Sequence, residues 1–286
     1  QYYIQTWHSS LRLKKIEKDT ESTLPKKYIK MAIEDSKKCD LLLSGCKMST
    51  EIFKRAFWYD GKYFEHGTPR NDILFQNNTL LKEQIRRRLN ISPNSKVVLY
   101  APTFRKNNNL DVYNMDYEKA ANNLSQKFGG KWTVLVKLHP HLMAKSNQLL
   151  SGCNVTDVTT YDDIQELLFI SDVLITDYSS VMFDFALTRR PCFLYAPDIV
   201  DYINNDRQMY FDITRLPFPC SVNDNDLAKK IAGFDETEYK YQLEKFLDKI
   251  GSFEKGNACE MLVKHIYKHI YKICFDKEGS EMYEKV

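Results

Sequence analysis

The chain has 286 residues, 43% of them apolar, which is enough to fill the cores of about two domains and excludes a fibre or a disordered tail. Its 41 Lys and Arg against 38 Asp and Glu leave a net charge of +3 with both signs interspersed, which disfavours a dedicated nucleic-acid binder. Seven scattered cysteines without a Cys-x-x-Cys pair indicate a reducing, cytosolic environment. No apolar run approaches the roughly 20 residues that span a bilayer, so membrane contact is expected to be peripheral.

The first residues read as a buried strand without an initiator Met, so we expect a piece of a longer protein whose first domain is only partly present. The sequence then predicts a strand at 2–6, a helix at 26–40, a strand at 41–44 and a helix opened by Ser49 or Thr50. The polar segment 90–95 is the expected boundary. Residues 1–90 are assigned to a first Rossmann-like domain and residues 91–286 to a second.

Beyond the boundary, short apolar runs alternate with amphipathic stretches, which is typical of an α/β fold with a mainly parallel sheet. Strands are predicted at 97–100, 132–138, 173–176 and 192–195, and helices at 117–128, 164–170 and 181–187. The strands are continuously apolar because helices cover both faces of such a sheet. After Asp198 the sheet signal stops, and helices are predicted at 226–232, 236–250 and 257–273.

Ligands of open α/β sheets bind beyond the carboxyl ends of the strands, so the strand-to-helix turns are the places to search for chemistry. Ser179 and Ser180 stand at a predicted helix start, where free N–H groups and two hydroxyls would hold a phosphate. An ordinary serine N-cap explains the same pattern equally well.

Two further turns carry histidines. His139 ends a predicted strand and could contact a phosphate, whereas a metal pair with His141 lacks a third ligand of suitable spacing. His8 follows the first strand and could act as a general base, although a single histidine is more often structural.

Cations near these turns could neutralise a diphosphate, and the alternative for each is a solvated charge. They are Arg70, Arg105, Lys137 and Arg207. Neither a Gly-x-Gly-x-x-Gly nor a Gly-x-x-x-x-Gly-Lys motif is present, which disfavours dinucleotide dehydrogenases and P-loop NTPases.

Taken in order, the turns resemble the CDP-glycerol glycerophosphotransferase family, which builds poly(glycerol phosphate) teichoic acids and related capsule polymers. The resemblance rests on TWHSSLRLKKIEKD (6–19), GTPRND (67–72), APTFR (101–105), KLHP (137–140), SDVLITDYSSVMFDFALTRRPCFLYAPD (171–198), RQMYFD (207–212) and GNA (256–258). Around His8 the pattern is more similar to a capsule-type branch.

The resemblance implies a GT-B fold, in which two Rossmann-like domains face a cleft and the second binds the donor nucleotide. It implies that His8 takes a proton from the acceptor hydroxyl and that His139 contacts the donor phosphates. It also implies donor-binding roles for Arg70, Pro102, Thr103, Ser179, Ser180 and Asp184.

The expected reaction is attack of an acceptor hydroxyl on the β-phosphorus of CDP-glycerol or a close CDP-polyol, which releases CMP without a cofactor or metal. The acceptor would be a poly(glycerol phosphate) or capsule polymer, lipid-linked at the inner face of the membrane. Residues 260–277 could rest on that membrane or pack back on the domains. A GT-B glycosyltransferase using a nucleotide sugar and a non-catalytic polymer-binding module remain alternatives.

Overall fold

The computed structural model describes residues 1–105, 110–145, 154–205, 208–271, 273–275 and 281–283. The chain divides into two compact units, each made of segments that are separate in the sequence. Unit 1 comprises residues 1–12, 16–76 and 250–286, and unit 2 comprises residues 13–15 and 77–249. Both are α/β with parallel sheets, which confirms the predicted fold class.

Unit 1 is built on a three-stranded parallel sheet in the order β1-β2-β3, in which Ile4 lies opposite Leu41 and Leu42 opposite Tyr63. Its elements are β1 (Ile4–Gln5), η1 (Glu17–Thr23), α1 (Lys26–Lys38), β2 (Leu41–Leu43), α2 (Lys47–Ala56), β3 (Lys62–Phe64), η2 (Pro69–Phe75), α11 (Ala258–Ile266), η6 (Tyr267–Tyr271), β10 (Ile273–Phe275) and β11 (Glu281–Tyr283). The two last strands pair antiparallel with each other.

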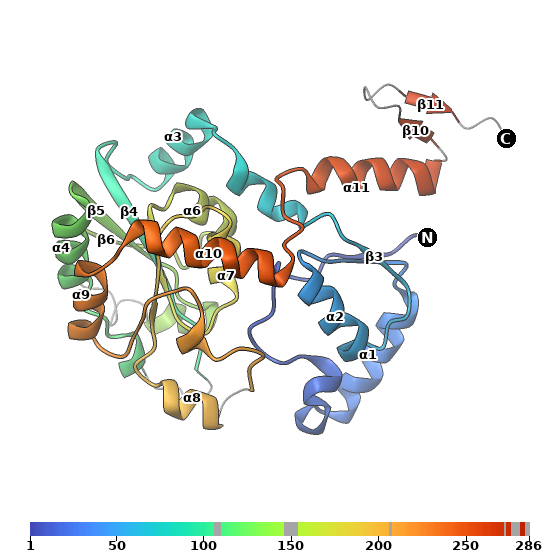
Figure 1. Cartoon of the computed structure of the whole chain (residues 1–286), viewed down its shortest axis with the longest axis horizontal. Helices are drawn as coiled ribbons and strands as arrows, with labels where there is room; N and C mark the ends of the chain where they lie inside the picture. The colour runs from blue at the N-terminus through green and yellow to red at the C-terminus, as the bar shows by residue number, and fades with distance from the viewer. Residues whose placement is uncertain (106–109, 146–153, 206–207, 272, 276–280, 284–286) are drawn as a thin grey trace. The chain divides into compact units, whose positions relative to one another are not determined.

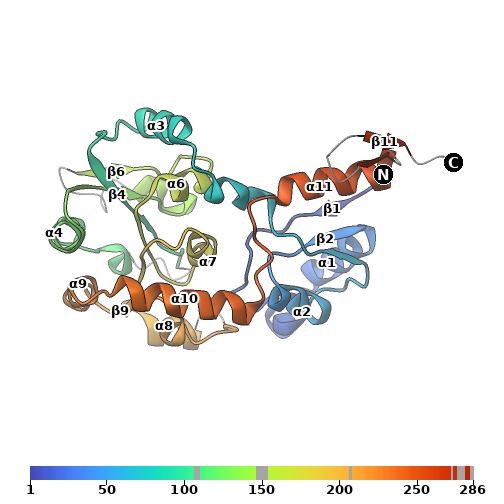
Figure 2. The same ribbon diagram turned by 45° about the horizontal axis from the view of Figure 1, so that its top comes forward.

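The helix α11 packs on the sheet of unit 1. Met261 and Leu262 lie against the buried cluster of Leu41, Leu43 and Phe64. Figure 2 shows the first residues beside this helix, where the Tyr2 hydroxyl lies 3.0 Å from Nε2 of His265. The apolar side of the last helix is therefore used for packing. Its predicted span of 257–273 is too long, because a π-helical turn and β10 follow residue 266.

Unit 2 holds a six-stranded, entirely parallel sheet in the order β6-β5-β4-β7-β8-β9. Its elements are α3 (Thr79–Arg88), β4 (Ser95–Ala101), η3 (Asp111–Tyr113), α4 (Tyr117–Phe128), β5 (Lys131–Val136), η4 (Pro140–Lys145), β6 (Val155–Asp157), α6 (Ile164–Ile170), β7 (Val173–Thr176), α7 (Val181–Ala186), β8 (Cys192–Tyr195), α8 (Ile199–Asn205), η5 (Ile213–Arg215), β9 (Cys220–Ser221), α9 (Asp224–Ala232) and α10 (Glu236–Ile250). The helices α4 and α9 lie side by side (Figure 1).

Local signals explain why the central elements of unit 2 were predictable. Asp116 caps α4 by accepting a hydrogen bond from the Lys119 amide at 2.9 Å, and Gly129 ends the helix with φ of +70°. The four residues of β7 are all buried, as a covered parallel strand requires. The predicted bounds of α4, α6, β7, β8 and α10 are confirmed.

Two further expectations about the elements are wrong, and two strands were missed. The helix α2 begins at Lys47 rather than at Ser49 or Thr50, because the Cys46 sulfur accepts from the Ser49 amide at 3.3 Å and takes the capping role. The sheet does not stop at Asp198, since β9 pairs with β8. The strands β3 and β6 were not predicted, because only the last residue of β3 and none of β6 is buried, so neither forms a continuous apolar run.

The division into units also differs from the expected boundary at residue 90. The helix α3 belongs to unit 2, where Ile85 is completely buried and Arg88 pairs with Glu166 at 3.4 Å. The residues from 250 onward return to unit 1, because Asp72 accepts hydrogen bonds from the amides of Ala258 and Cys259 at 3.0 and 2.7 Å and so caps α11. No described helix combines the length and apolar character needed to cross a bilayer.

Candidate functional site

The turn after β1 places His8 beside one aromatic residue, Trp7, and one cationic residue, Arg12, within unit 1. Trp7 adopts the left-handed region at φ of +53°, a strained conformation for a bulky residue. The Trp7 and His8 rings lie 4.9 Å apart between centroids. Arg12 is buried, and its Nη1 lies 2.8 Å from Nε2 of His8, so the guanidinium donates and the imidazole accepts.

The surroundings of His8 keep its ring neutral. Partial withdrawal of the ring from water, followed by the positive charges of Arg12 and Arg70, lowers the pKa of His8 to about 4. At neutral pH the imidazole is therefore neutral, and its one lone pair, on Nε2, accepts from Arg12, so the ring can act as a general base only when Arg12 releases Nε2. Arg70 comes from η2 and is exposed. The structure thus brings His8 and Arg70 into one electrostatic environment and adds Arg12.

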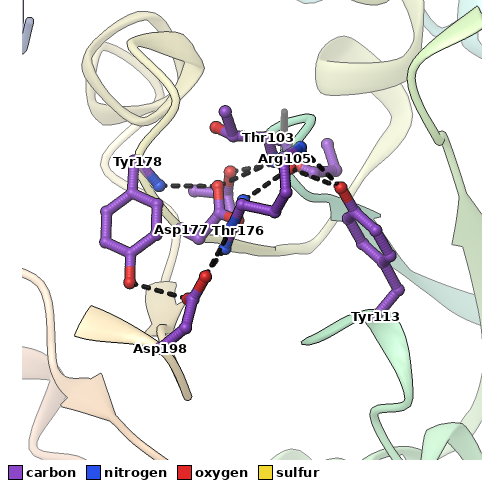
Figure 3. Close-up of polar contacts among 8 residues, drawn as sticks. Thr103, Arg105, Tyr113, Thr176, Asp177, Tyr178 and Asp198 are labelled. Carbon is purple, nitrogen blue, oxygen red and sulfur yellow. Dashed lines mark hydrogen bonds and ion pairs between the residues drawn. The ribbon is translucent and has the colours of Figure 1, made fainter. Parts of the chain in front are cut away.

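In unit 2, the turn after β4 is held by a buried ion-pair network around Arg105 (Figure 3). The guanidinium binds Asp198 with two hydrogen bonds of 2.7 and 3.0 Å and reaches Asp177 at 2.8 Å. Only 3% of the Arg105 side chain is exposed. Asp177 in turn accepts from the Thr103 amide at 2.8 Å, and the Tyr178 hydroxyl donates to Asp198 at 2.9 Å.

This network fixes the turn that carries Pro102 and Thr103. Burial alone would lower the pKa of Arg105, but Asp177 and Asp198 raise it above its ordinary value. The guanidinium is occupied by two carboxylates and by the Thr103 carbonyl, which favours a positioning role over direct contact with a phosphate. Pro102 is buried, and within the described chain the buried hydroxyl of Thr103 has no hydrogen-bond partner.

The exposed His139 and His141, which follow β5, cluster with the half-buried Phe104, which follows β4. The two imidazole rings lie 4.8 Å apart, and Phe104 lies 5.1 Å from His139. Burial and the neighbouring His141 lower the pKa of His139. Lys137 donates to the carbonyls of Thr159 and Tyr161 at 3.3 and 2.5 Å, and burial lowers its pKa. Its ammonium group therefore already has two protein partners.

The predicted phosphate cradle precedes α7. The Ser179 hydroxyl accepts from the Val181 amide at 3.4 Å, and that of Ser180 accepts from the Leu13 amide at 3.4 Å. Neither makes a short capping bond. Asp184 is completely buried in α7. Arg207 lies outside the described residues.

Three side chains of these sites were not predicted from the sequence. They are Arg12, Asp177 and Asp198. Asp177 and Asp198 lie inside the block 171–198, but only the fold brings Asp198 to Arg105 across 93 residues. In the part of the chain that the structure describes, no group of three or more His, Cys, Asp or Glu side chains is arranged to hold a metal ion.

Glu17 is a buried carboxylate in the segment that follows the His8 turn. It has φ of +47°, and its Oε1 accepts from the Tyr28 hydroxyl at 2.7 Å, while Oε2 has no hydrogen-bond partner among the described residues. Burial raises the pKa of Glu17, so its ionised form destabilises the fold as pH rises through that pKa. We expect Glu17→Gln to raise the melting temperature at pH 7 by a few degrees, about 2–4 °C per kcal/mol.

The gain should vanish near pH 4, where Glu17 is protonated in both the folded and the unfolded chain. Thermal unfolding at the two pH values measures it. Glu21→Gln in the same 3-10 helix, at an exposed position, is the matched control and should change nothing. An equal gain at both pH values would contradict the electrostatic explanation.

Two parallel-sheet units, with titratable and hydroxyl side chains in their strand-end turns, define a GT-B-like α/β protein. The chain matches the CDP-Glycerol:Poly(glycerophosphate) glycerophosphotransferase family over residues 1–268 and belongs to that family. This chain is similar to the solved structure of the wall teichoic acid polymerase TagF, with a TM-score of 0.80 and 34% sequence identity. The match covers 95% of this chain and 69% of the TagF chain.

The relatives that this chain matches are consistent with the family assignment. A teichoic acid poly(glycerol phosphate) polymerase of Staphylococcus epidermidis is 35% identical over 284 residues, 94% of this chain and 39% of that protein. The Bacillus subtilis protein of the same name is 36% identical over 279 residues, 93% and 37% of the two chains. This chain therefore spans less than two fifths of the length of these relatives. A UDP-GlcNAc 2-epimerase from Neisseria meningitidis, at 15% identity and a TM-score of 0.54, shows the fold alone.

Proposed function

We propose that this chain transfers glycerol phosphate from CDP-glycerol to the terminal hydroxyl of a poly(glycerol phosphate) chain and releases CMP. The family match over residues 1–268 carries the proposal, because that range contains every candidate site residue. A TagF variant has been solved after soaking with CDPG, and this chain matches it at 33% identity with a TM-score of 0.80.

In the proposed reaction, the acceptor hydroxyl oxygen bonds to the β-phosphorus while the bond from phosphorus to the CMP oxygen breaks. His8 accepts the hydroxyl proton at Nε2 when substrate takes the place of Arg12 there, and its ring is neutral before it does so. CMP leaves as the phosphate anion, and positive charge and hydroxyl groups stabilise the negative charge that develops.

Donor-binding roles are assigned to the following residues from their places in the family motifs. Arg70 and His139 would contact the donor phosphates, Ser179 and Ser180 would donate hydroxyl hydrogen bonds, and the unpartnered Thr103 hydroxyl supports a further contact. Lys137, Pro102, Asp184 and Arg105 would shape the donor site, with Arg105 acting through Asp177 and Asp198. The proposal assigns Arg207 to the donor on its place in the motif alone. It includes no cofactor or metal.

The proposed acceptor is a teichoic acid chain, with a capsule polymer as the alternative, and we propose that it is lipid-linked. We propose that the reaction lies on the cytoplasmic side, which a nucleotide-activated donor supports, with peripheral contact at the inner membrane face. Exposed Val263 and the basic side chains of Lys264 and Lys268 support such contact, because α11 already uses Met261 and Leu262 for packing.

The test is CMP release from CDP-glycerol with and without a glycerol-phosphate-primed acceptor. Release that depends on acceptor, and that persists in EDTA, is expected. CDP-ribitol and a UDP-sugar in parallel reactions define the donor. Turnover of the UDP-sugar with inertness toward CDP-glycerol would overturn the proposal, as would binding of polymer without any binding of CDP-glycerol.

A further inference from the structure

A buried glutamate in unit 1 binds the loop that carries Arg70. Glu254 lies shortly after the last residue of α10, and only 9% of it is exposed. Its Oε1 accepts from the Thr68 hydroxyl at 2.6 Å and from the Asn71 amide group at 3.2 Å, and its Oε2 accepts from the Thr68 backbone amide at 3.1 Å. The partners thus flank Arg70 on both sides.

The hydrogen bonds to Glu254 suit a carboxylate group but not a neutral amide in its place. Each of these three partners donates, and Asn71 also donates to the Thr68 oxygen at 2.7 Å, which directs the Thr68 hydroxyl hydrogen toward Glu254. A glutamine at this position would turn an NH₂ group toward a donor in either orientation. An ionised and satisfied carboxylate of this kind binds its donors more strongly than a neutral group does.

Two glycines show how closely the neighbouring segments approach Glu254. A Cβ on Gly67, which has φ of +89°, would stand 2.8 Å from Oε2. A Cβ on Gly45 would stand 2.7 Å from Oε1 and 2.5 Å from the Ser10 Cα. Ser10 is two residues from His8, and its carbonyl also accepts from the Ser49 hydroxyl at 2.7 Å. The segments that carry His8 and Arg70 therefore meet around one carboxylate.

We infer that Glu254 is a positioning residue that holds the His8 turn and the Arg70 loop in their relative arrangement within unit 1. The inference rests on the proposed function for the roles of His8 and Arg70. Neutralising the carboxylate should therefore loosen the Arg70 loop. Burial of the ring, followed by the charges of Arg12 and Arg70, lowers the pKa of His8, so a loosened loop, by moving Arg70 away, should let His8 take a proton more readily.

The experiment compares Glu254→Gln with wild type in two measurements. The kcat/KM for CMP release is expected to fall about 10- to 100-fold, the usual effect of a displaced catalytic group. The NMR titration midpoint of His8, assigned by its loss in a His8→Asn spectrum, is expected to move upward from about 4. Glu260→Gln, which breaks an exposed ion pair with Lys264 in the same unit, is the control and should change neither.

Thr68→Val removes the hydroxyl that donates to Glu254 Oε1, and it replaces Glu254→Gln in the test if that variant does not fold. It should shift the His8 titration in the same direction, and the double variant should add little. A wild-type His8 titration in a folded Glu254→Gln protein would overturn the inference, whatever its activity. Absence of CMP release from the wild type would refute the proposed function instead, and the titration would still decide the role of Glu254.

Discussion

Replacement of His8 by alanine is expected to slow acceptor-dependent CMP release by at least about 100-fold while CDP-glycerol still binds. Loss of a positioned general base typically costs a factor of about 10² to 10⁴. Donor binding should persist, because the residues proposed for the donor phosphates are unchanged. Steady-state CMP release and calorimetric titration with CDP-glycerol measure the two quantities. The exposed His66 of the same unit provides the control, since His66→Ala should retain wild-type turnover.

The same histidine sets the expected acid limb of the pH profile. Because a base must be neutral, and the pKa of His8 is lowered to about 4 from 6.5, kcat/KM should stay level from pH 7 down to about pH 5 and fall below that. A limb near pH 6.5 would show that another group, or a His8 with an ordinary pKa, controls the rate. The profile therefore separates this assignment from a merely structural histidine.

Arg105→Ala is expected to lower the free energy of unfolding by about 3–5 kcal/mol, because it leaves Asp177 and Asp198 without their cation. Urea unfolding followed by fluorescence measures the change. Arg189→Ala is the matched control: Arg189 pairs with Glu244 at 2.8 Å, but the two side chains are 40% and 49% exposed, so the loss should be below about 1 kcal/mol.

The cost of Arg105→Ala should depend on pH in a defined direction. Burial would raise the pKa of Asp198, but its bonds to Arg105 lower it below 3.8, so its contribution to stability is present above that pH and lost as pH falls further. The difference between variant and wild type should therefore shrink below about pH 4. A cost that is constant from pH 7 to pH 3 would show that lost packing, rather than unpaired charge, causes it.

The elements that could be predicted are those with complete local signals. The helix α4 has an Asp cap, a Gly end and an apolar stripe, and β7 is a continuously buried run. The strands β3 and β9 have three and two residues, and their existence depends on partners that lie far along the chain. Likewise, α3 belongs to unit 2 because it contacts α6, and no local sequence pattern reveals that contact.

The residues of the candidate site likewise fall into those that the sequence could predict and those that it could not. His8, His139 and Ser179 could be identified because each stands in a strand-end turn. The partners that tune them could not: Arg12 turns back to His8 only because of the conformation of the turn, and Glu254 reaches Thr68 across 186 residues. The sequence also could not show that Arg105 is buried between two carboxylates, since a solvated cation and a buried one look alike in sequence.

The discontinuous composition of the two units has a consequence for biosynthesis. Unit 2 is complete once residue 249 has left the ribosome, whereas unit 1 needs the segment from Ile250 onward for the cap on α11 and for the cover of Leu41, Leu43 and Phe64. Vectorial synthesis therefore delays the closing of unit 1 until α11 emerges, and until then its small sheet exposes apolar surface to chaperones and proteases. A premature stop near residue 250 would leave unit 2 attached to an unfinished unit 1 that is open to degradation.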